Sequence, residues 1–482
     1  MVGITSFGGY IPRYRLNRFN IFGAMGWFNP VTIAVAQGEK AVANYDEDSL
    51  TMAVAAGLDA LSGMDRSKID GVYLASTTLP YKERSCAAIA AAAMDLKTEA
   101  RVADFGESVK GGTTALISAV DAVKSGEVNN IMVLAADFRM GKMGSMVEQF
   151  YGDGAGCLVI GKDNVVAEFK GSFSVSYDFV DHFRGDSKPF DRTWEERWIR
   201  DEGYTKFIPE AIGGLLKKTG TKAEDVAKVV YPCYFGRDHK TIGTKLGFKP
   251  EAIHDNMHTT VGDTGAAHPF VMMVSALQDA KPGDKIVVAS FGTGCDALLF
   301  EVTDKISKLS GIGGIKASLA NKADLAPYEK YAVFRNIIPM EVGIRGEDSA
   351  FTAFSTLWRK RKAVLSLIGT KCTECNTPQF PPQRICVNPD CGAVDQMEDY
   401  RFSDKEATIF SYTGDMLSFC YDPPQVYGII RFKGGGRLWT DFTDCKLDDV
   451  SVGQKVKLSF RRKYYDDKRG IHGYFWKAVP VK

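Results

Sequence analysis

Four cysteines in the C-terminal third have the spacing of a metal site. They stand in KCTECNTPQFPPQRICVNPDCGA, where Cys372 and Cys375 form a CxxC pair and Cys386 and Cys391 follow as a second pair. Two cysteine pairs on turns can surround one zinc ion with four thiolates. Four thiolates leave no open coordination position, so we expect a structural zinc rather than a catalytic one, with a disulfide as the alternative.

A second stretch, VADFGESVKGGTTAL at residues 102–116, has the pattern of a strand, a turn and the start of a helix. The double glycine Gly111–Gly112 lets the backbone come close to a bound ligand. A nucleophile displayed there would lie at the end of a buried strand. The turn contains no strong nucleophile, however, but only Glu107, Ser108, Val109 and Lys110.

The elements that would position this turn occur twice between residue 1 and about residue 303. The first half predicts helices at 49–61 and 111–125 and strands at 71–76 and 129–137; the second predicts helices at 205–217 and 270–280 and strands at 227–235 and 284–292. Such alternation predicts an α/β fold with a mostly parallel sheet covered on both faces. The duplication predicts a pseudo-twofold arrangement in which the turns at 107–110 and 259–269 meet at one central site.

The rest of the chain has a different pattern. Residues 305–369 form a connector whose basic stretch 355–369 predicts one amphipathic helix, either docked on a neighbour or solvated. Residues 405–482 alternate apolar and polar side chains, which predicts a small all-β barrel of the OB type. We therefore expect five segments: 1–165 and 166–304 as the two halves, 305–369 as connector, 370–395 as zinc ribbon and 396–482 as OB-fold domain.

Composition excludes several classes of protein. The 482 residues carry a formal net charge of +1 with 45% hydrophobic residues, which is ordinary for a globular protein and argues against a nucleic-acid binder, even though Arg461, Arg462 and Lys463 adjoin two tyrosines. We find no apolar run long enough to span a bilayer and no signal-peptide pattern. Cysteines in a metal spacing fit a reducing compartment, so we expect a cytoplasmic protein.

The first 300 residues resemble the thiolase superfamily, especially hydroxymethylglutaryl-CoA synthases. The resemblance is carried by GITSFGGYIPRYRL (3–16), GGTTAL (111–116), FYGDGAGCLVIG (150–161), VGDTGAAHP (261–269) and SFGTGCDALLFEV (290–302). The last 110 residues are similar to zinc-ribbon and OB-fold proteins that accompany thiolases. This resemblance implies a duplicated, five-layered thiolase fold, followed by a small zinc ribbon and an OB barrel. It also implies an acyl-CoA substrate and a homodimer formed through the thiolase domains.

The catalytic pattern of those synthases does not carry over. By the resemblance, their Cys nucleophile falls on Val109, their Glu on Thr77, their His on Pro232 and their Asn on Asp263. Valine cannot form a thioester and proline cannot accept a proton, so the acyl-enzyme route is closed. Related proteins that lack the Cys cleave β-hydroxyacyl-CoA by a retro-aldol reaction, which needs a base and an enolate donor but no covalent nucleophile.

The residues beside the two turns suggest how such a reaction would be catalysed. Asp263 is a candidate base, and His268 and His258 are candidate acids or enolate donors, although Asp263 could cap a helix and His268 could simply begin one. Glu107 and Lys110 flank the missing nucleophile and could also pair with each other. Cys295, in the loop containing Gly292 and Gly294, is a rival nucleophile.

CoA is the expected ligand, as the substrate of the reaction. Backbone near Gly111, Gly112, Gly292 and Gly294 would line its pantetheine arm, and basic residues would bind its phosphates: Arg184, Lys206, Arg237 and Lys240. Each of these cations could instead be solvated. Three functions follow as hypotheses: an enzyme making or breaking a C–C bond beside a CoA thioester without a Cys nucleophile, a catalytically silent acyl-CoA-binding partner of a catalytic thiolase, or a synthase or thiolase using a displaced Cys.

Overall fold

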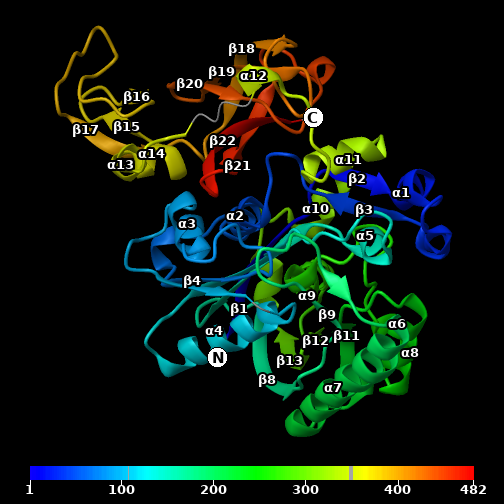
Figure 1. Cartoon of the computed structure of the whole chain (residues 1–482). Helices are drawn as coiled ribbons and strands as arrows, with labels where there is room; N and C mark the ends of the chain where they lie inside the picture. The colour runs from blue at the N-terminus through cyan, green and yellow to red at the C-terminus, as the bar shows by residue number, and fades with distance from the viewer. Residues whose placement is uncertain (107, 347–350, 482) are drawn as a thin grey trace. The chain divides into compact units, whose positions relative to one another are not determined.

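The computed structural model describes residues 1–106, 108–346 and 351–481, which form two compact units (Figure 1). The first unit comprises residues 1–43, 48–91 and 96–331. The second comprises residues 332–482 together with the short segments 44–47 and 92–95.

A continuous nine-stranded sheet runs through the described part of the first unit. Its strands follow the order β11 (Val226–Val230), β12 (Lys285–Phe291), β13 (Gly294–Val302), β8 (Ala167–Ser176), β1 (Gly3–Tyr10), β7 (Gly154–Gly161), β6 (Ile131–Asp137), β4 (Gly71–Ala75) and β5 (Arg101–Phe105). Strand β4 is parallel to β5 and β6, and β11 is parallel to β12. The five pairings between β12 and β6 are antiparallel.

The expectation of a mostly parallel sheet is therefore wrong for the middle of the sheet. The central strands are buried on both faces; in β7, for example, all eight residues are buried. A strand buried on both faces is a continuous apolar run whether its neighbours are parallel or antiparallel, so the sequence pattern does not distinguish the two.

Helices from both halves of the first unit build the core around this sheet. Helix α2 (Ser49–Ala60) starts at a capping box formed by Asp48 and Thr51. Helices α4 (Gly111–Ser125) and α9 (His268–Leu277) share one apolar cluster with the inner strands, to which α4 contributes Leu116, Val120 and Val123 at helical spacing. Helix α7 (Thr205–Thr219) packs on the second half of the sheet through a separate cluster.

The two glycine-bearing turns meet, as the duplication predicts. Residues 108–110 precede α4, and turn 259–267 precedes α9. A Cβ atom added at Gly112 would lie 2.6 Å from the Ala266 carbonyl oxygen, so only glycine permits this approach. The starts of the two equivalent helices therefore adjoin each other.

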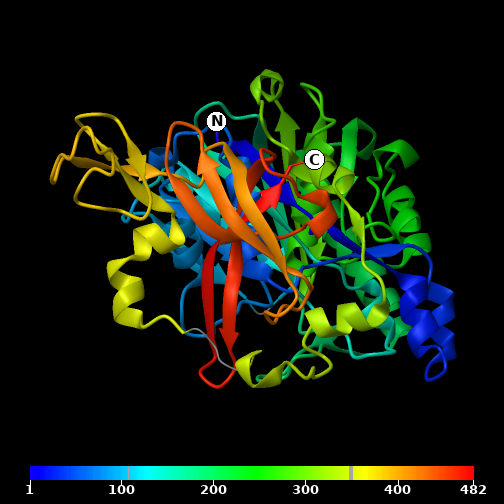
Figure 2. The same ribbon diagram turned by 90° about the horizontal axis from the view of Figure 1, so that it is seen from above.

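The second unit contains two small β structures (Figure 2). Strands β15 (Ile368–Cys372), β16 (Pro378–Gln379) and β17 (Met397–Arg401) form a three-stranded sheet around the four-cysteine segment. The barrel contains β18 (Ala407–Asp415), β19 (Gln425–Phe432), β20 (Arg437–Asp441), β21 (Lys455–Asp466) and β22 (Ile471–Pro480), in the order β20-β19-β18-β21-β22. A bridge between Phe442 and Ala478 joins the ends of this sheet, and Trp476 is fully buried inside it.

The single helix expected at 355–369 is wrong. The structure has two short helices, α13 (Phe354–Arg359) and α14 (Arg361–Leu365), and then enters β15. Lys360 lies between the two helices with a φ of −106°, which is not helical. In the part of the chain that the structure describes, no helix is both long and apolar enough to cross a membrane.

Candidate functional site

The turn before α4 is held by the second half of the sheet. The Ser108 hydroxyl donates to the Gly292 carbonyl oxygen at 3.2 Å, and a Cβ at Gly292 would lie 2.8 Å from Val109 Cγ2. Lys110 Nζ lies 3.3 Å from the buried carboxylate of Asp296, which also accepts from the hydroxyls of Thr113 and Thr114 at 3.0 Å. Glu107, the suggested partner of Lys110, lies outside the described residues. Among the described carboxylates, Asp296 pairs with Lys110.

A buried carboxylate occupies the end of β6, beside Thr77. Asp137 Oδ1 accepts from the Thr77 amide at 2.7 Å and from the hydroxyls of Ser76, Thr77 and Thr78 at 3.0 Å. Its Oδ2 accepts from the Ala266 amide at 2.7 Å. Burial raises the pKa of Asp137, against these hydrogen bonds and the nearby Arg139. Asp137 thus joins the β4 turn to the turn before α9.

Arg139 is the centre of a buried ionic cluster. Its guanidinium donates to Asp191 at 2.9 Å and to the Tyr151 hydroxyl at 2.7 Å, and it lies 3.6 Å from Asp263 Oδ2. Asp263 also accepts from the Gly265 amide at 2.9 Å, as a helix-capping carboxylate would. Its side chain remains about one-sixth exposed, since its relative accessibility is 16%. Asp263 is therefore oriented on both oxygens yet open to a ligand.

The two candidate histidines have different surroundings. His268 is buried, and its Nδ1 accepts from the Thr264 amide at 2.9 Å while Nε2 lies 2.7 Å from the Asn256 carbonyl oxygen. Both of its ring nitrogens are thus engaged with backbone. His258 is also buried and packs against the rings of Phe150 and Tyr234. Burial lowers the pKa of His258 well below its usual range, with a further contribution from Arg18, so this imidazole is neutral.

The four cysteines of the first unit do not have the environment of a nucleophile. Cys86, Cys157, Cys233 and Cys295 are all buried. Burial, with a contribution from Asp104, raises the pKa of Cys86 to about 12, and burial raises the pKa of the other three still further. Since the thiolate is the nucleophile, this environment speaks against Cys295 as a displaced nucleophile.

Two tyrosines that the sequence analysis did not single out lie beside the meeting turns. Tyr204 ends a six-residue π-helix, Ile199–Tyr204, and its ring lies 4.4 Å from Phe291, the residue before Gly292. Tyr234 lies 5.4 Å from Tyr204 and stacks at 5.0 Å on Phe150, whose carbonyl oxygen accepts from the Asp263 amide. Neither hydroxyl has a hydrogen-bond partner within the described ranges, although Tyr204 is only 7% exposed.

Burial raises the pKa of Tyr204 and of Tyr234 well above the usual range, and the Asp263 carboxylate contributes to both shifts. The two phenols are therefore protonated donors at neutral pH. Neither hydroxyl oxygen is among the buried, unpartnered polar atoms of the described residues, so both are accessible from outside the protein. Each can therefore donate a hydrogen bond to a polar atom of a ligand.

The basic candidates for CoA phosphates fall into two groups. Arg184 donates to the Thr77 carbonyl oxygen and lies 3.5 Å from Asp191, so it belongs to the Arg139 cluster. Lys206 is exposed and pairs with Glu202. Arg237 and Lys240 are exposed on α8 (Gly236–Lys245). Only Arg184 is thus brought together with the polar residues of the turns.

The glycines that were expected to line the CoA arm allow neighbouring backbone segments to pack closely. Gly111 and Gly112 begin α4, and Gly292 touches the turn before it. At Gly294, φ is 112° and a Cβ would lie 2.1 Å from the Val175 carbonyl oxygen, so this glycine permits the approach of β13 to β8. Gly294 thus serves strand packing.

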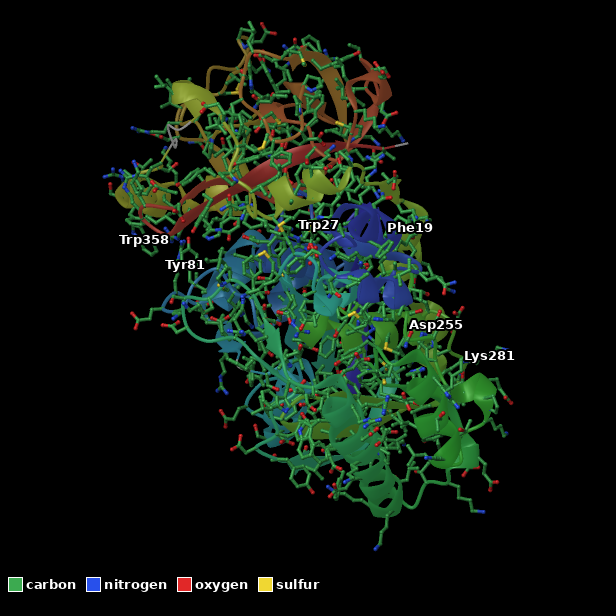
Figure 3. The ribbon with its side chains drawn as sticks, turned by 45° about the vertical axis from the view of Figure 1, so that its right-hand side comes forward. Phe19, Trp27, Tyr81, Asp255, Lys281 and Trp358 are labelled. Carbon is green, nitrogen blue, oxygen red and sulfur yellow. The ribbon has the colours of Figure 1, made fainter. Side chains whose placement is uncertain are left out.

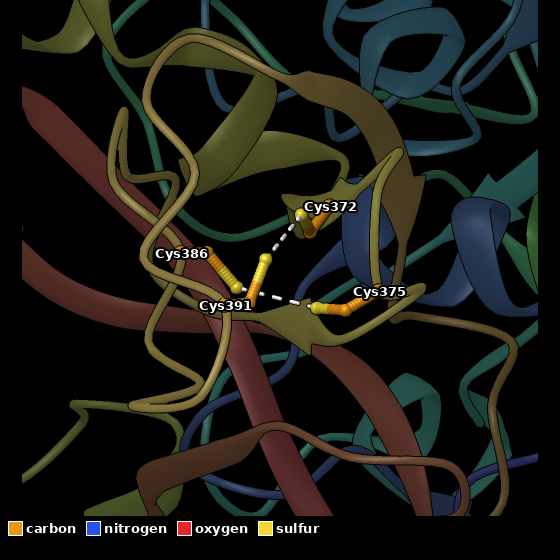
Figure 4. Close-up of side chains that lie close together, drawn as sticks. All are labelled: Cys372, Cys375, Cys386 and Cys391. Atoms are coloured by element: carbon orange, nitrogen blue, oxygen red, sulfur yellow. Dashed lines mark hydrogen bonds between the residues drawn. The ribbon is translucent and has the colours of Figure 1, made fainter.

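The four C-terminal cysteines converge in the second unit (Figure 4). Their sulfur atoms all lie within 4.8 Å of one another; Cys372 and Cys391 are 3.9 Å apart, and Cys375 and Cys386 are 3.5 Å apart. All four are free thiols rather than disulfides. Four sulfur donors in one cluster fit a tetrahedral ion such as zinc.

Sequence reasoning missed the Arg139 cluster and the tyrosine pair. Arg139 stands in DFRMGK and Asp191 in KPFDRT, and neither has a partner at a recognisable spacing. The available signal was indirect, because a charged residue just beyond the end of a strand such as β6 lies where ligands often bind. Tyr204 lies in WIRDEGYTKF, where a π-helix cannot be read from apolar periodicity.

Comparison with known proteins agrees with this architecture. Residues 216–301 match the family described as the C-terminal part of 3-oxoacyl-[acyl-carrier-protein] synthase III. Residues 359–397 match the rubredoxin-like zinc ribbon domain of ChsH2, and residues 400–461 match its C-terminal OB-fold domain. A solved hydroxymethylglutaryl-CoA synthase complexed with CoA is similar at a TM-score of 0.62 and 18% identity, covering 74% of this chain and 95% of that one. The synthase III of Aquifex aeolicus aligns at a TM-score of 0.56 and 21% identity, covering 62% of this chain and all of that one.

These findings define an α/β protein of the thiolase fold, extended by a zinc ribbon and an OB domain. Among curated relatives, the hydroxymethylglutaryl-CoA synthase of Methanocaldococcus jannaschii is 32% identical over 349 residues, which are 70% of this chain and all of that protein. The synthase of Methanothermobacter thermautotrophicus is 30% identical over 347 residues, again 70% of this chain and all of that protein. The chain belongs to the hydroxymethylglutaryl-CoA synthase family.

Proposed function

We propose that this chain makes or breaks a carbon–carbon bond next to a CoA thioester without a cysteine nucleophile. One observation carries the proposal: the cysteines of the first unit are buried thiols of raised pKa, whereas one of the meeting turns presents the Asp263 carboxylate, and two phenols beside the turns have no hydroxyl partner among the described residues. An aldol-type reaction needs a base and an enolate donor, which these groups can supply.

The roles follow from what each group offers. In the cleavage direction, Asp263 accepts the proton of the β-hydroxyl group while the Cα–Cβ bond breaks. The β-carbon becomes a carbonyl, and the bonding electrons move into the thioester as an enolate. Tyr204 and Tyr234 donate hydrogen bonds to the enolate oxygen, and a proton returned to Cα gives the shortened acyl-CoA. The reverse sequence forms the bond.

Arg139 acts on this reaction through Asp263. It lies 3.6 Å from Oδ2 of Asp263 and is itself held by Asp191 and Tyr151. A fixed cation beside the carboxylate holds it in one orientation, which proton transfer requires. We assign Arg139 as a positioning residue and Asp263 as the base.

The experiment is a mass-spectrometric assay of the full chain with a panel of 3-hydroxyacyl-CoA and 3-oxoacyl-CoA esters. Shortened or lengthened CoA products are expected. Tyr204→Phe, Tyr234→Phe and Asp263→Asn should each lower kcat about 10²-fold or more. Tyr177→Phe is the matched control, because Tyr177 is exposed and its hydroxyl donates to Glu210 on the outside of the protein. Unchanged rates in Tyr204→Phe and Tyr234→Phe would refute the assigned roles.

Cofactors and assembly belong to the same proposal. The CoA nucleotide would use Arg237 and Lys240, which are exposed cations without a described partner. The four clustered thiols would hold a structural zinc ion. A homodimer is proposed from family membership, and a cytoplasmic location from the free cysteines.

A second function is favoured by one surface feature. Large apolar side chains are exposed along α1 (Arg18–Met25) and the residues after it: Phe19, Trp27, Phe28, Val31 and Ile33, of which Phe19 and Trp27 are labelled in Figure 3. Trp27 is 81% exposed and Phe28 65%. Such surfaces mark protein interfaces, so the chain could bind acyl-CoA as the silent partner of a catalytic thiolase. Turnover by the purified chain alone would exclude this second function.

A further inference from the structure

Two arginines stand opposite each other on the outer face of the barrel. In the register of β19 and β20, Arg431 pairs directly with Arg437, and both are exposed. Like charges in directly opposed positions of an antiparallel pair destabilise the sheet. A pairing that lowers the stability of the sheet in this way often marks a functional position.

Both guanidinium groups rest on one phenyl ring. Arg431 Cζ lies 4.6 Å and Arg437 Cζ 4.3 Å from the ring centre of Phe410. Phe410 is the extra residue of a bulge, since the β18–β19 register shifts between Ile409 and Ser411. A bulge redirects a side chain, and here it brings the ring to the outer face.

The described residues leave both arginines without an acidic partner. No carboxylate lies within 4.0 Å of either guanidinium, and neither side chain makes a hydrogen bond. Two stacked guanidinium groups with all their donors unused are a strong site for a multivalent oxyanion, above all a phosphate.

An aromatic platform lies in the next row of the same face. Trp439 pairs with Ile429, two residues along each strand from the arginine pair, and is 67% exposed. Its indole stacks on Tyr427, with ring centres 5.7 Å apart and planes at 21°. An exposed and supported indole ring offers a stacking surface for a planar base.

The far end of this face is acidic. Tyr427 pairs with Asp441, and the Tyr427 hydroxyl donates to Asp415 at 3.4 Å. Asp441 is paired with Lys463 at 2.7 Å, so the repulsion at this end comes from Asp415, which has no cationic partner among the described residues. That charge disfavours a phosphate chain continuing past the platform, so the face suits one base with its adjoining phosphates.

We propose that the outer face of β18–β20 binds a nucleotide, with its phosphates on Arg431 and Arg437 and its base on Trp439. The nucleotide is either free or the end of a second CoA thioester, distinct from the one whose phosphates Arg237 and Lys240 would bind. Only the second source rests on the function proposed above.

The test uses the full chain and a photoreactive azido derivative of adenosine 3′,5′-bisphosphate, followed by mapping of the labelled peptides. Label is expected on peptides that contain Phe410 or Trp439. Arg431→Gln with Arg437→Gln should reduce that labelling at least about tenfold, because two charge-assisted contacts are lost. Lys457→Gln is the control, since Lys457 is an exposed cation on β21 of the same barrel. Label confined to residues 1–331 would overturn the proposal.

Competition identifies the source and the class of ligand. Displacement of the label by CoA but not by ATP indicates a CoA thioester, and displacement by both indicates free nucleotides. Displacement by a thymidine oligonucleotide at lower concentration than by either nucleotide would overturn the proposal in favour of nucleic acid. Displacement by an acidic peptide alone would overturn it in favour of a protein partner. Labelling without turnover of acyl-CoA would sustain this site while refuting the proposed function.

Discussion

Lys110 Nζ lies 3.3 Å from the carboxylate of Asp296, which joins the turn before α4 to strand β13. The carboxylate is 2% exposed and the ammonium 15%. Removing one partner of a buried ion pair leaves the other charge uncompensated. Lys110→Met should therefore lower the free energy of unfolding by roughly 3 kcal/mol.

Chemical denaturation followed by circular dichroism measures this effect. The double variant Lys110→Met, Asp296→Leu is informative, because it removes both charges at once. It should recover part of the loss. A stability equal to that of the wild type in Lys110→Met would show that the pair contributes nothing.

Gly292 touches the turn so closely that a methyl group should disturb it. A Cβ there would lie 2.8 Å from Val109 Cγ2 and 3.0 Å from the Lys110 amide nitrogen. Gly292→Ala should cost about 1–3 kcal/mol through overpacking and lower any acyl-CoA turnover.

Gly213→Ala is the matched control for this change. Gly213 lies inside α7, and a Cβ there would meet no atom within 4 Å. It should stabilise the protein by about 0.5–1 kcal/mol, because alanine loses less backbone entropy in a helix. Equal melting temperatures for the two variants would contradict the close approach at Gly292.

Stability at low pH should depend on Asp46 in the second unit. Burial would raise the pKa of Asp46, but Lys477 at 2.8 Å and Arg461 at 3.1 Å outweigh it and hold the pKa at about 2. Because the folded pKa lies below the unfolded value of 3.8, the stabilisation is complete above about pH 4 and is lost as the pH falls towards 2. The shift corresponds to about 2 kcal/mol.

The predicted loss of stability at low pH is tested by urea unfolding of the wild type and of Asp46→Asn between pH 6 and about pH 2.5. Asp46→Asn should be less stable than the wild type at neutral pH, and the difference should shrink on acidification. A difference that is constant with pH would exclude the ion cluster as its source.

Metal analysis tests the four-cysteine cluster. The purified chain should contain a single zinc ion, and Cys375→Ser should lose most of it. Chelation should lower the melting temperature of the second unit, since binding energy of a structural metal is folding energy. Chelation should leave acyl-CoA turnover unchanged on the time scale before unfolding, as expected of a site without an open coordination position. Full metal retention in Cys375→Ser would refute a four-thiolate site.

Local patterns predicted the parts of the molecule that depend on neighbouring residues. The α/β class, the thiolase and zinc-ribbon/OB resemblance and the start of α4 at Gly111 are confirmed, because each is encoded in contiguous motifs. The roles of Asp263, His268 and Lys110 stay predictions. Contacts between residues far apart in the sequence could not be predicted. Asp296 lies beside Lys110 because of the register in which β13 pairs in the sheet. Tyr204 lies beside Tyr234 because of the π-helix that ends at Tyr204.

The central claim is that the chain works on a CoA thioester without a covalent enzyme intermediate. Intact-protein mass spectrometry during incubation with the 3-hydroxyacyl-CoA panel tests it most directly, with the CoA products followed in the same samples. We predict shortened acyl-CoA products while the mass of the protein stays unmodified. An acyl adduct that maps to Cys86, Cys157, Cys233 or Cys295 would contradict the claim, and so would the absence of any new CoA product.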